Sequence, residues 1–229
     1  MPMTLSILPF LDLVSVIWFL LFWFCYTYFA DNSRWSSNSL THKINRYRED
    51  WMMEMINRDM RMVDTTILGN LMTGIAFFAS TAMLILGGTV ALLGDATQAY
   101  EAIKNLPFAA DSTPALWEIK ILFLALIFIY AFFKFAWAFR LTNYCNIMVG
   151  SAPTRDADRI KAQSHAKRTA QISCRAGHHF NRGLRAYFFG TVALGWLFHP
   201  LLMAGGATVV VIVLYRREFS STALLALQD

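Results

Sequence analysis

A line of basic and imidazole side chains near the end of the chain is the feature of this sequence that could do chemistry. Arg175, His178, Arg182 and Arg185 recur every three or four residues, which places them on one face of a helix. Guanidinium groups attract anions, and a neighbouring histidine could make that attraction depend on pH. Hydrocarbon-compatible sequence follows directly, over residues 187–215. This basic face is therefore either a helix face exposed to water or the lining of an anion-interacting path.

Other polar residues stand inside or beside apolar segments and complete a candidate polar network. Asp12 lies within the first apolar run and Lys134 within the third. Asp12 can sit near the outer surface and stay hydrated, or it can be buried against a basic residue from the second half of the chain. Lys134 can reach the headgroups with its aliphatic stem, or it can be enclosed as a pathway residue or counter-ion. The remaining candidates are Arg61, Asp64, Arg140, Asn143 and Asn181.

Metal and enzyme chemistry has little support in the sequence. Cys174 and His178 are one helical turn apart, and His165 or His179 could join them, but the second pair of ligands of a structural zinc site is missing. The chain has no nucleophile elbow, phosphate-binding glycine loop or kinase motif. We therefore expect no metal, no cofactor and no catalytic activity.

The composition is that of a membrane protein. Hydrophobic residues make up 56% of the 229 positions and charged residues only 15%, whereas soluble domains carry about 25% charged residues. The net charge of +5 does not indicate a nucleic-acid partner, because Lys and Arg gather beside the apolar segments as the positive-inside rule requires. Three widely spaced cysteines, an odd number, imply no disulfide framework.

Four long apolar segments predict an all-α, polytopic membrane protein that forms a single integral membrane domain over residues 1–229. The first three segments are each long enough to cross a hydrocarbon core of about 30 Å. Gly69, Gly74 and other small residues line one face of the second segment, so we expect that span to be central in the bundle. The first three spans are residues 7–29, 63–93 and 116–139.

The fourth apolar segment is expected to split at His199-Pro200. Proline removes a backbone donor and restricts the residue before it, which breaks a helix there. A hairpin of two short spans, residues 178–198 and 201–215, then gives five spans in all and a cytoplasmic C-terminus. If residues 187–214 instead cross once, the C-terminus lies outside together with Arg216 and Arg217, against the charge rule.

The charged segments between the spans are expected on the cytoplasmic side. Residues 35–62 and 154–177 have apolar positions at helical spacing opposite charged ones, which predicts amphipathic helices. Ser39 or Thr41 is a plausible cap for the first of them. The loop over residues 94–114 is acidic and belongs outside, as does the N-terminus. We expect a multi-pass protein of the bacterial inner membrane.

Several segments resemble an uncharacterised family of bacterial and plant membrane proteins, catalogued only as a domain of unknown function numbered in the five-hundreds. The resemblance covers most of the chain and implies the architecture but no reaction. It rests on Trp51-Met52, Arg58, the run Arg61-Met62-Val63-Asp64, residues 77–81, residues 133–137, Arg140, Asn143-Tyr144, Ala152-Pro153, residues 180–188 and residues 214–219.

Two functions from different classes fit these observations. The first is an oligomeric channel or transporter-like protein with a basic path, because broken helices coordinate ions in transporters and a ring of identical subunits can enclose a pore. The second is a non-catalytic membrane scaffold or regulatory subunit that binds anionic lipid or a partner membrane protein. We expect membrane lipids, which can be anionic, as partners and no nucleic acid; a homo-oligomer is expected in order to build the path, and a partner membrane protein belongs to the scaffold reading.

Overall fold

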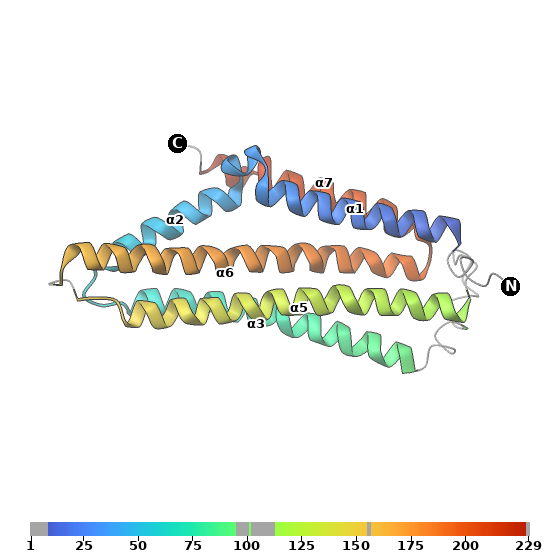
Figure 1. Cartoon of the computed structure of the whole chain (residues 1–229), viewed down its shortest axis with the longest axis horizontal. Helices are drawn as coiled ribbons and strands as arrows, with labels where there is room; N and C mark the ends of the chain where they lie inside the picture. The colour runs from blue at the N-terminus through green and yellow to red at the C-terminus, as the bar shows by residue number, and fades with distance from the viewer. Residues whose placement is uncertain (1–8, 95–100, 102–112, 155–156, 228–229) are drawn as a thin grey trace. The chain divides into compact units, whose positions relative to one another are not determined.

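The chain folds almost entirely into helices, as expected. The computed structural model describes residues 9–94, 101, 113–154 and 157–227, and no strand occurs among them (Figure 1). The elements in chain order are α1 (Phe10–Asn32), the 3-10 helix η1 (Arg34–Asn38), α2 (Leu40–Met55), α3 (Met62–Gly94), α5 (Pro114–Gly150), α6 (Arg159–Ala193), the 3-10 helix η2 (Leu194–Leu197), α7 (Pro200–Phe219) and α8 (Thr222–Leu225).

Four of the described segments are long and apolar enough to cross a membrane. They are α1, α3, α5 and the segment Pro200–Leu225, which correspond to the first three predicted spans and the second leg of the predicted hairpin. Residues 7 and 8 of the first predicted span, and most of the acidic loop over residues 94–114, lie outside the described residues. The all-α fold with four long apolar segments is thus confirmed.

Local signals in the sequence account for where several helices begin and end. The Ser39 Oγ accepts a hydrogen bond from the His42 backbone N–H at 3.1 Å, so Ser39 is the N-cap of α2. Helical geometry tightens to 3-10 over η2, and α7 begins at Pro200. Proline suits the first position of a helix because its missing N–H would have no partner there. The predicted break at His199-Pro200 is therefore present.

Two helices are much longer than a bilayer requires. The 37 residues of α5 correspond to about 55 Å and the 35 residues of α6 to about 52 Å, against a hydrocarbon core of about 30 Å. In α6, the polar stretch predicted over residues 154–177 and the span predicted over 178–198 are largely one continuous helix. Gly177 and Gly183 lie within it without interrupting it.

The chain divides into two compact units, and α3, α5 and α6 each contribute residues to both of them. Unit 1 comprises the described residues of 1–33, 82–131 and 184–217, and unit 2 those of 34–81, 132–183 and 218–229. Aromatic rings fill unit 1: Phe19 packs edge-on against Phe189 with ring centroids 5.4 Å apart. A Cβ at Gly190 of α6 would lie 2.8 Å from the Phe128 ring of α5, so glycine allows these two helices to approach closely.

Unit 2 has a core of a different kind, in which small residues of α6 pack against larger apolar side chains. Ala162, Ala166 and Ala170 recur every fourth residue and are buried, so they form one face of the helix. The other buried members of this core are Met52, Met55, Ile56, Leu68, Cys145, Val149 and Ala152. This arrangement brings residues of α2, α3, α5 and α6 into one cluster.

The expectation that the second span is central is wrong. Only 17% of the apolar window of α3 is buried, compared with 44% of the window of α5. No atom outside the helix lies within 4 Å of a Cβ built at Gly69 or Gly74. The glycines that permit close packing are instead Gly177, Gly183 and Gly190 of α6 and Gly206 of α7. Small residues allow close approach in lipid, but they do not decide which helix makes use of it.

Candidate functional site

Asp12 of α1 is buried next to a basic residue and an indole of unit 1. Its side chain accepts a hydrogen bond from Trp196 Nε1 at 2.7 Å and lies 3.4 Å from Lys120 Nζ. Asp12 and Lys120 are 3% and 2% exposed. Of the two situations considered for Asp12, the structure therefore shows the buried one, with a partner from the second half of the chain. Sequence reasoning missed Lys120, although a lone cation at the start of an apolar span was a usable signal.

The last cation of the basic face, Arg185, is neutralised inside unit 1. Its Nη1 lies 2.8 Å from Asp31 Oδ1, and the two side chains are 8% and 4% exposed. The guanidinium also lies 5.8 Å from the centre of the Tyr26 ring. A buried guanidinium is tolerable when a carboxylate compensates its charge. The pair joins the end of α1 to the last third of α6, because Asp31 and Arg185 lie on those helices.

Asp64 and Arg61 of unit 2 lie at the start of α3 and tie it to neighbouring segments. Asp64 is fully buried, and its Oδ1 accepts hydrogen bonds from Trp51 Nε1 and Arg58 Nη1, each at 2.7 Å. Its Oδ2 has no hydrogen-bond partner among the described residues. Arg61 donates to the carbonyl oxygens of Ala152, at 2.6 Å, and Pro153. Arg61 thus satisfies two backbone carbonyl groups in the segment that follows α5.

The other candidates of the predicted network differ in exposure and in hydrogen-bond partners. Arg175 is exposed, whereas His178, Asn181 and Arg182 are partly buried. Asn181 Nδ2 donates to Thr41 Oγ1 of α2 at 3.1 Å. The other three predicted residues are on α5: Lys134 is partly buried, Asn143 is exposed, and the exposed Arg140 donates from Nε to Tyr144 OH at 2.6 Å. Asp12 and Arg185 thus lie in unit 1 with separate partners, and the remaining candidates lie in unit 2.

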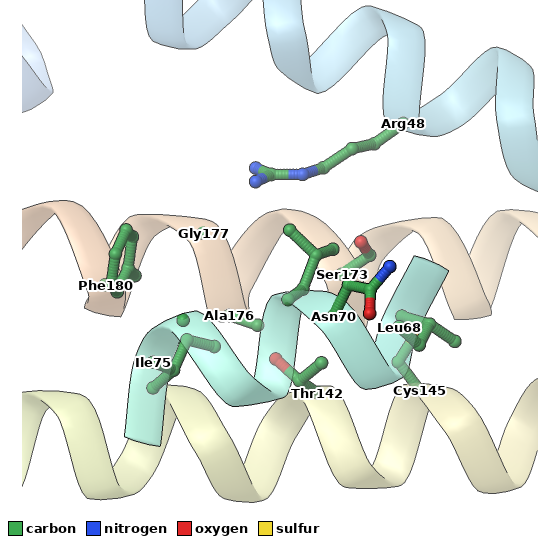
Figure 2. A pocket seen from close by; sticks show the side chains of 12 residues that line it. Arg48, Leu68, Asn70, Ile75, Thr142, Cys145, Ser173, Ala176, Gly177 and Phe180 are labelled. Atoms are coloured by element: carbon green, nitrogen blue, oxygen red, sulfur yellow. The ribbon is translucent and has the colours of Figure 1, made fainter. Parts of the chain in front are cut away.

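A cavity in unit 2 contains a cation that sequence reasoning did not select. Figure 2 shows the Arg48 side chain reaching from α2 toward α6, with residues of α3 and α5 on the other walls. The cavity holds about 150 Å³, and its lining is mostly apolar. The lining residues are Arg48, Leu68, Asn70, Leu71, Gly74, Ile75, Thr142, Cys145, Ser173, Ala176, Gly177 and Phe180. None of them is acidic.

Gly177 makes room for the Arg48 guanidinium. A Cβ built at Gly177 would lie 2.7 Å from Arg48 Cζ, which is closer than any side chain at that position could be accommodated without moving the arginine. Gly177 is itself buried. The glycine therefore has a specific purpose here: it lets a cation from α2 lie directly against the backbone of α6.

Arg48 has a neutral partner in place of a carboxylate. Its Nη1 donates to Asn45 Oδ1 at 2.8 Å, and no described residue forms an ion pair with it. Burial lowers the pKa of Arg48 from its ordinary value, while the sulfur atoms of Cys174 and Cys145 act in the opposite direction. Arginine nevertheless stays protonated in proteins. A positive charge without a carboxylate counter-ion thus faces a largely apolar cavity.

The structure also bears on the metal question. Among the residues that the structure describes, no three or more His, Cys, Asp or Glu side chains are grouped so that they could hold a metal ion. The Cys174 Sγ, considered above as a ligand, lies 3.7 Å from the Asn45 backbone oxygen. Burial raises the pKa of this thiol, which disfavours the thiolate that a metal would require.

Long apolar helices together with buried, paired charges define a polytopic helical membrane protein. The chain belongs to the family described as "Protein of unknown function, DUF599", whose model matches residues 14–223. The predicted resemblance is thereby confirmed over nearly the whole chain, and this family has no assigned activity. Comparison with curated proteins gave no match, and comparison with solved structures gave none either.

Proposed function

We propose that the protein is a non-catalytic membrane scaffold or regulatory subunit that binds anionic lipid headgroups and a partner protein on the cytoplasmic side. The observation that carries this proposal is the pairing of Arg185 with Asp31. The cation that would have lined the deepest part of a basic path is neutralised within the protein. Buried ion pairs of this kind fix how helices pack, which is what a scaffold requires.

Cations at the boundary of the apolar segments are available to lipid headgroups. Arg140 and Arg175 are exposed on α5 and α6. Each Lys or Arg near an anionic surface contributes about 1 kcal/mol to lipid binding, and the effect fades within a Debye length of about 8 Å. These two arginines therefore favour an anionic headgroup over a zwitterionic one at the cytoplasmic leaflet.

The polar half of α6 offers a second basic surface, suited to a protein partner. Arg159, Lys161, Lys167 and Arg168 are all exposed on it. Arg159 lies 16 residues before Arg175, or about 24 Å along a helix. A helix that continues out of the bilayer carries such residues beyond the reach of the lipid charges. An acidic face on a partner is the complementary surface.

An anion-conducting path is the second candidate function. It is favoured by His178, Asn181 and Arg182, which are partly exposed within about one turn of α6, and by His179, whose Nδ1 is buried without a hydrogen-bond partner among the described residues. A homo-oligomer would be needed to enclose such a path. The scaffold proposal does not depend on an oligomer.

One preparation separates the two candidates. The purified protein is reconstituted in liposomes, and chloride flux is compared for the unmodified chain, Arg182→Ala and empty liposomes. A scaffold gives flux equal to that of empty liposomes in every case. Chloride flux that depends on Arg182 would instead support the conducting path, and native mass spectrometry of the same sample reports the oligomeric state.

The lipid part of the proposal is measured on the same material. We expect anionic phospholipid to be enriched in the purified protein relative to the source membrane. The double variant Arg140→Gln with Arg175→Gln should retain less of it, whereas Arg159→Gln with Lys161→Gln should retain as much as the unmodified chain. Equal lipid retention by both pairs would contradict headgroup binding at the boundary.

A further inference from the structure

We propose that the Arg48 cavity binds the carboxylate of a long-chain fatty acid, with the acyl chain leaving the cavity along α3. This site is distinct from the surface cations of the proposed function and does not depend on them. The inference rests on the charge in the cavity, its size, and the side on which it opens.

The charge in the cavity identifies the headgroup. Arg48 donates to one neutral amide oxygen, and no acidic residue lines the cavity. A guanidinium presents two parallel N–H groups that match the two oxygens of a carboxylate. Such a pair strengthens when water is excluded, and the cavity walls around Arg48 are mostly apolar. An anion is therefore the ligand group that complements the site.

The volume of the cavity limits what else it can hold. About 150 Å³ is the size of an engineered apolar cavity that accepts benzene. A carboxylate and the first few methylene groups of a chain occupy a similar space. A glycerophospholipid carries a phosphate, a glycerol and two ester groups at the headgroup end of its chains, which is more than this space accommodates. The size thus favours a single-chain amphiphile.

The rim of the cavity shows where the rest of the chain would lie. Leu71 and Gly74 line the cavity and are also exposed, and Phe77 is 62% exposed one turn further along α3. Leu68 lies four residues after Asp64 and Ile75 eleven, or about 6 and 16 Å along the helix. The rim therefore lies where α3 leaves its polar start, and an acyl chain on Leu71 and Phe77 would run into the hydrocarbon.

Two pairs of variants test the site, and each has a control on the same helix. Arg48→Gln removes the charge, and Arg46→Gln removes a charge that does not line this cavity. Gly74→Leu places a side chain at the rim, and Gly69→Leu places one five residues earlier, outside the lining. A Cβ at either glycine meets no atom within 4 Å, so both leucine variants are expected to fold.

The measurement is binding of tritiated palmitate to the purified full-length chain in detergent, read by scintillation proximity. We expect saturable binding, at least about tenfold weaker in Arg48→Gln because a charge-assisted bidentate bond is lost, and unchanged in Arg46→Gln. Gly74→Leu should weaken binding and Gly69→Leu should not. Unlabelled palmitate should compete at least about tenfold better than hexadecanol, which has the same chain without the carboxylate.

Several results would overturn the proposal. Equal competition by palmitate and hexadecanol would show that Arg48 does not recognise the carboxylate. Displacement of palmitate by equimolar phosphatidylglycerol or by inorganic phosphate would assign the site to a phosphate group. If Arg48→Gln loses helicity or elutes as an aggregate, Gly74→Leu and Gly69→Leu are compared instead. Equal palmitate binding by these two variants would exclude this cavity. Chloride flux and phospholipid retention are separate measurements, so this proposal and the scaffold proposal can fail independently.

Discussion

Single residues in this protein show how a membrane chain can retain buried charge. Lys120 and Asp12 lie 3.4 Å apart at 2% and 3% exposure, and Trp196 donates a hydrogen bond to the same carboxylate oxygen. Removing one member of a buried pair leaves the other charged and desolvated, whereas replacing both with apolar groups can be nearly neutral. The pair therefore makes the packing of α1 on α5 depend on both residues being present.

We expect Lys120→Met to lower the free energy of unfolding by about 3–5 kcal/mol, because Asp12 is left without its counter-ion. The double variant Lys120→Met with Asp12→Leu should recover most of that loss. Unfolding in detergent, followed by circular dichroism, gives both values. The exposed Glu118→Gln, two residues from Lys120, is the control. An equal loss in the single and double variants would mean that the loss does not come from the unpaired charge of Asp12.

At the scale of whole elements, α6 is a helix in which glycines allow neighbouring helices to approach closely. Built Cβ atoms at Gly183 and Gly190 would lie 2.6 and 2.8 Å from the rings of Phe135 and Phe128 of α5. Each glycine lies in the same unit as the ring that it meets. At each glycine, the aromatic ring packs directly against the backbone of α6. A larger residue at either position would prevent this contact. Dispersion between well-fitted surfaces is a main source of helix association in lipid.

Gly190→Val should destabilise the fold by about 1–3 kcal/mol through overpacking against Phe128. Gly205→Val in α7 should have a much smaller effect, because a Cβ there meets no atom within 4 Å. Valine has the same helix propensity at both positions, so the comparison isolates packing. Thermal unfolding monitored by size-exclusion recovery gives the difference. Equal melting temperatures would show that α5 and α6 have room to separate at this point.

At the scale of the whole molecule, the order of spans and the charges at their ends lead to a prediction about orientation. Arg216 and Arg217 lie in the last turn of α7, and most of the other cations of the chain lie within residues 34–61 and 140–185. The break before Pro200 supplies the turn that a fifth span requires. A short final hairpin then returns the C-terminus to the side where the positive-inside rule places it.

A tag at the C-terminus should therefore be reached by a protease or antibody only after the cytoplasmic membrane is opened. A tag at the N-terminus should be reached from outside without such opening. The measurement uses intact bacterial cells and spheroplasts, with a known periplasmic tag and a known cytoplasmic tag as references. A C-terminal tag accessible from outside would rule out the fifth span and with it the hairpin.

The sequence by itself determined that this is a membrane protein, where its long apolar segments lie, and that the helix breaks at Pro200. Each of these follows from local composition, helical period or backbone chemistry, which neighbouring residues carry. It also marked Asp12 and Arg185 as unusual, because charge in an apolar run is costly wherever the chain folds.

Only the tertiary structure decided which residues compensate those charges and where a ligand could enter. Lys120 meets Asp12 and Asp31 meets Arg185 across 108 and 154 positions of sequence, and nothing local ties one to the other. Arg48 is one charge among many in the amphipathic segment 35–62, and Gly177 has no side chain that could mark a site. Their meeting at one cavity depends on which faces of α2 and α6 pack together, and that is a property of the folded chain.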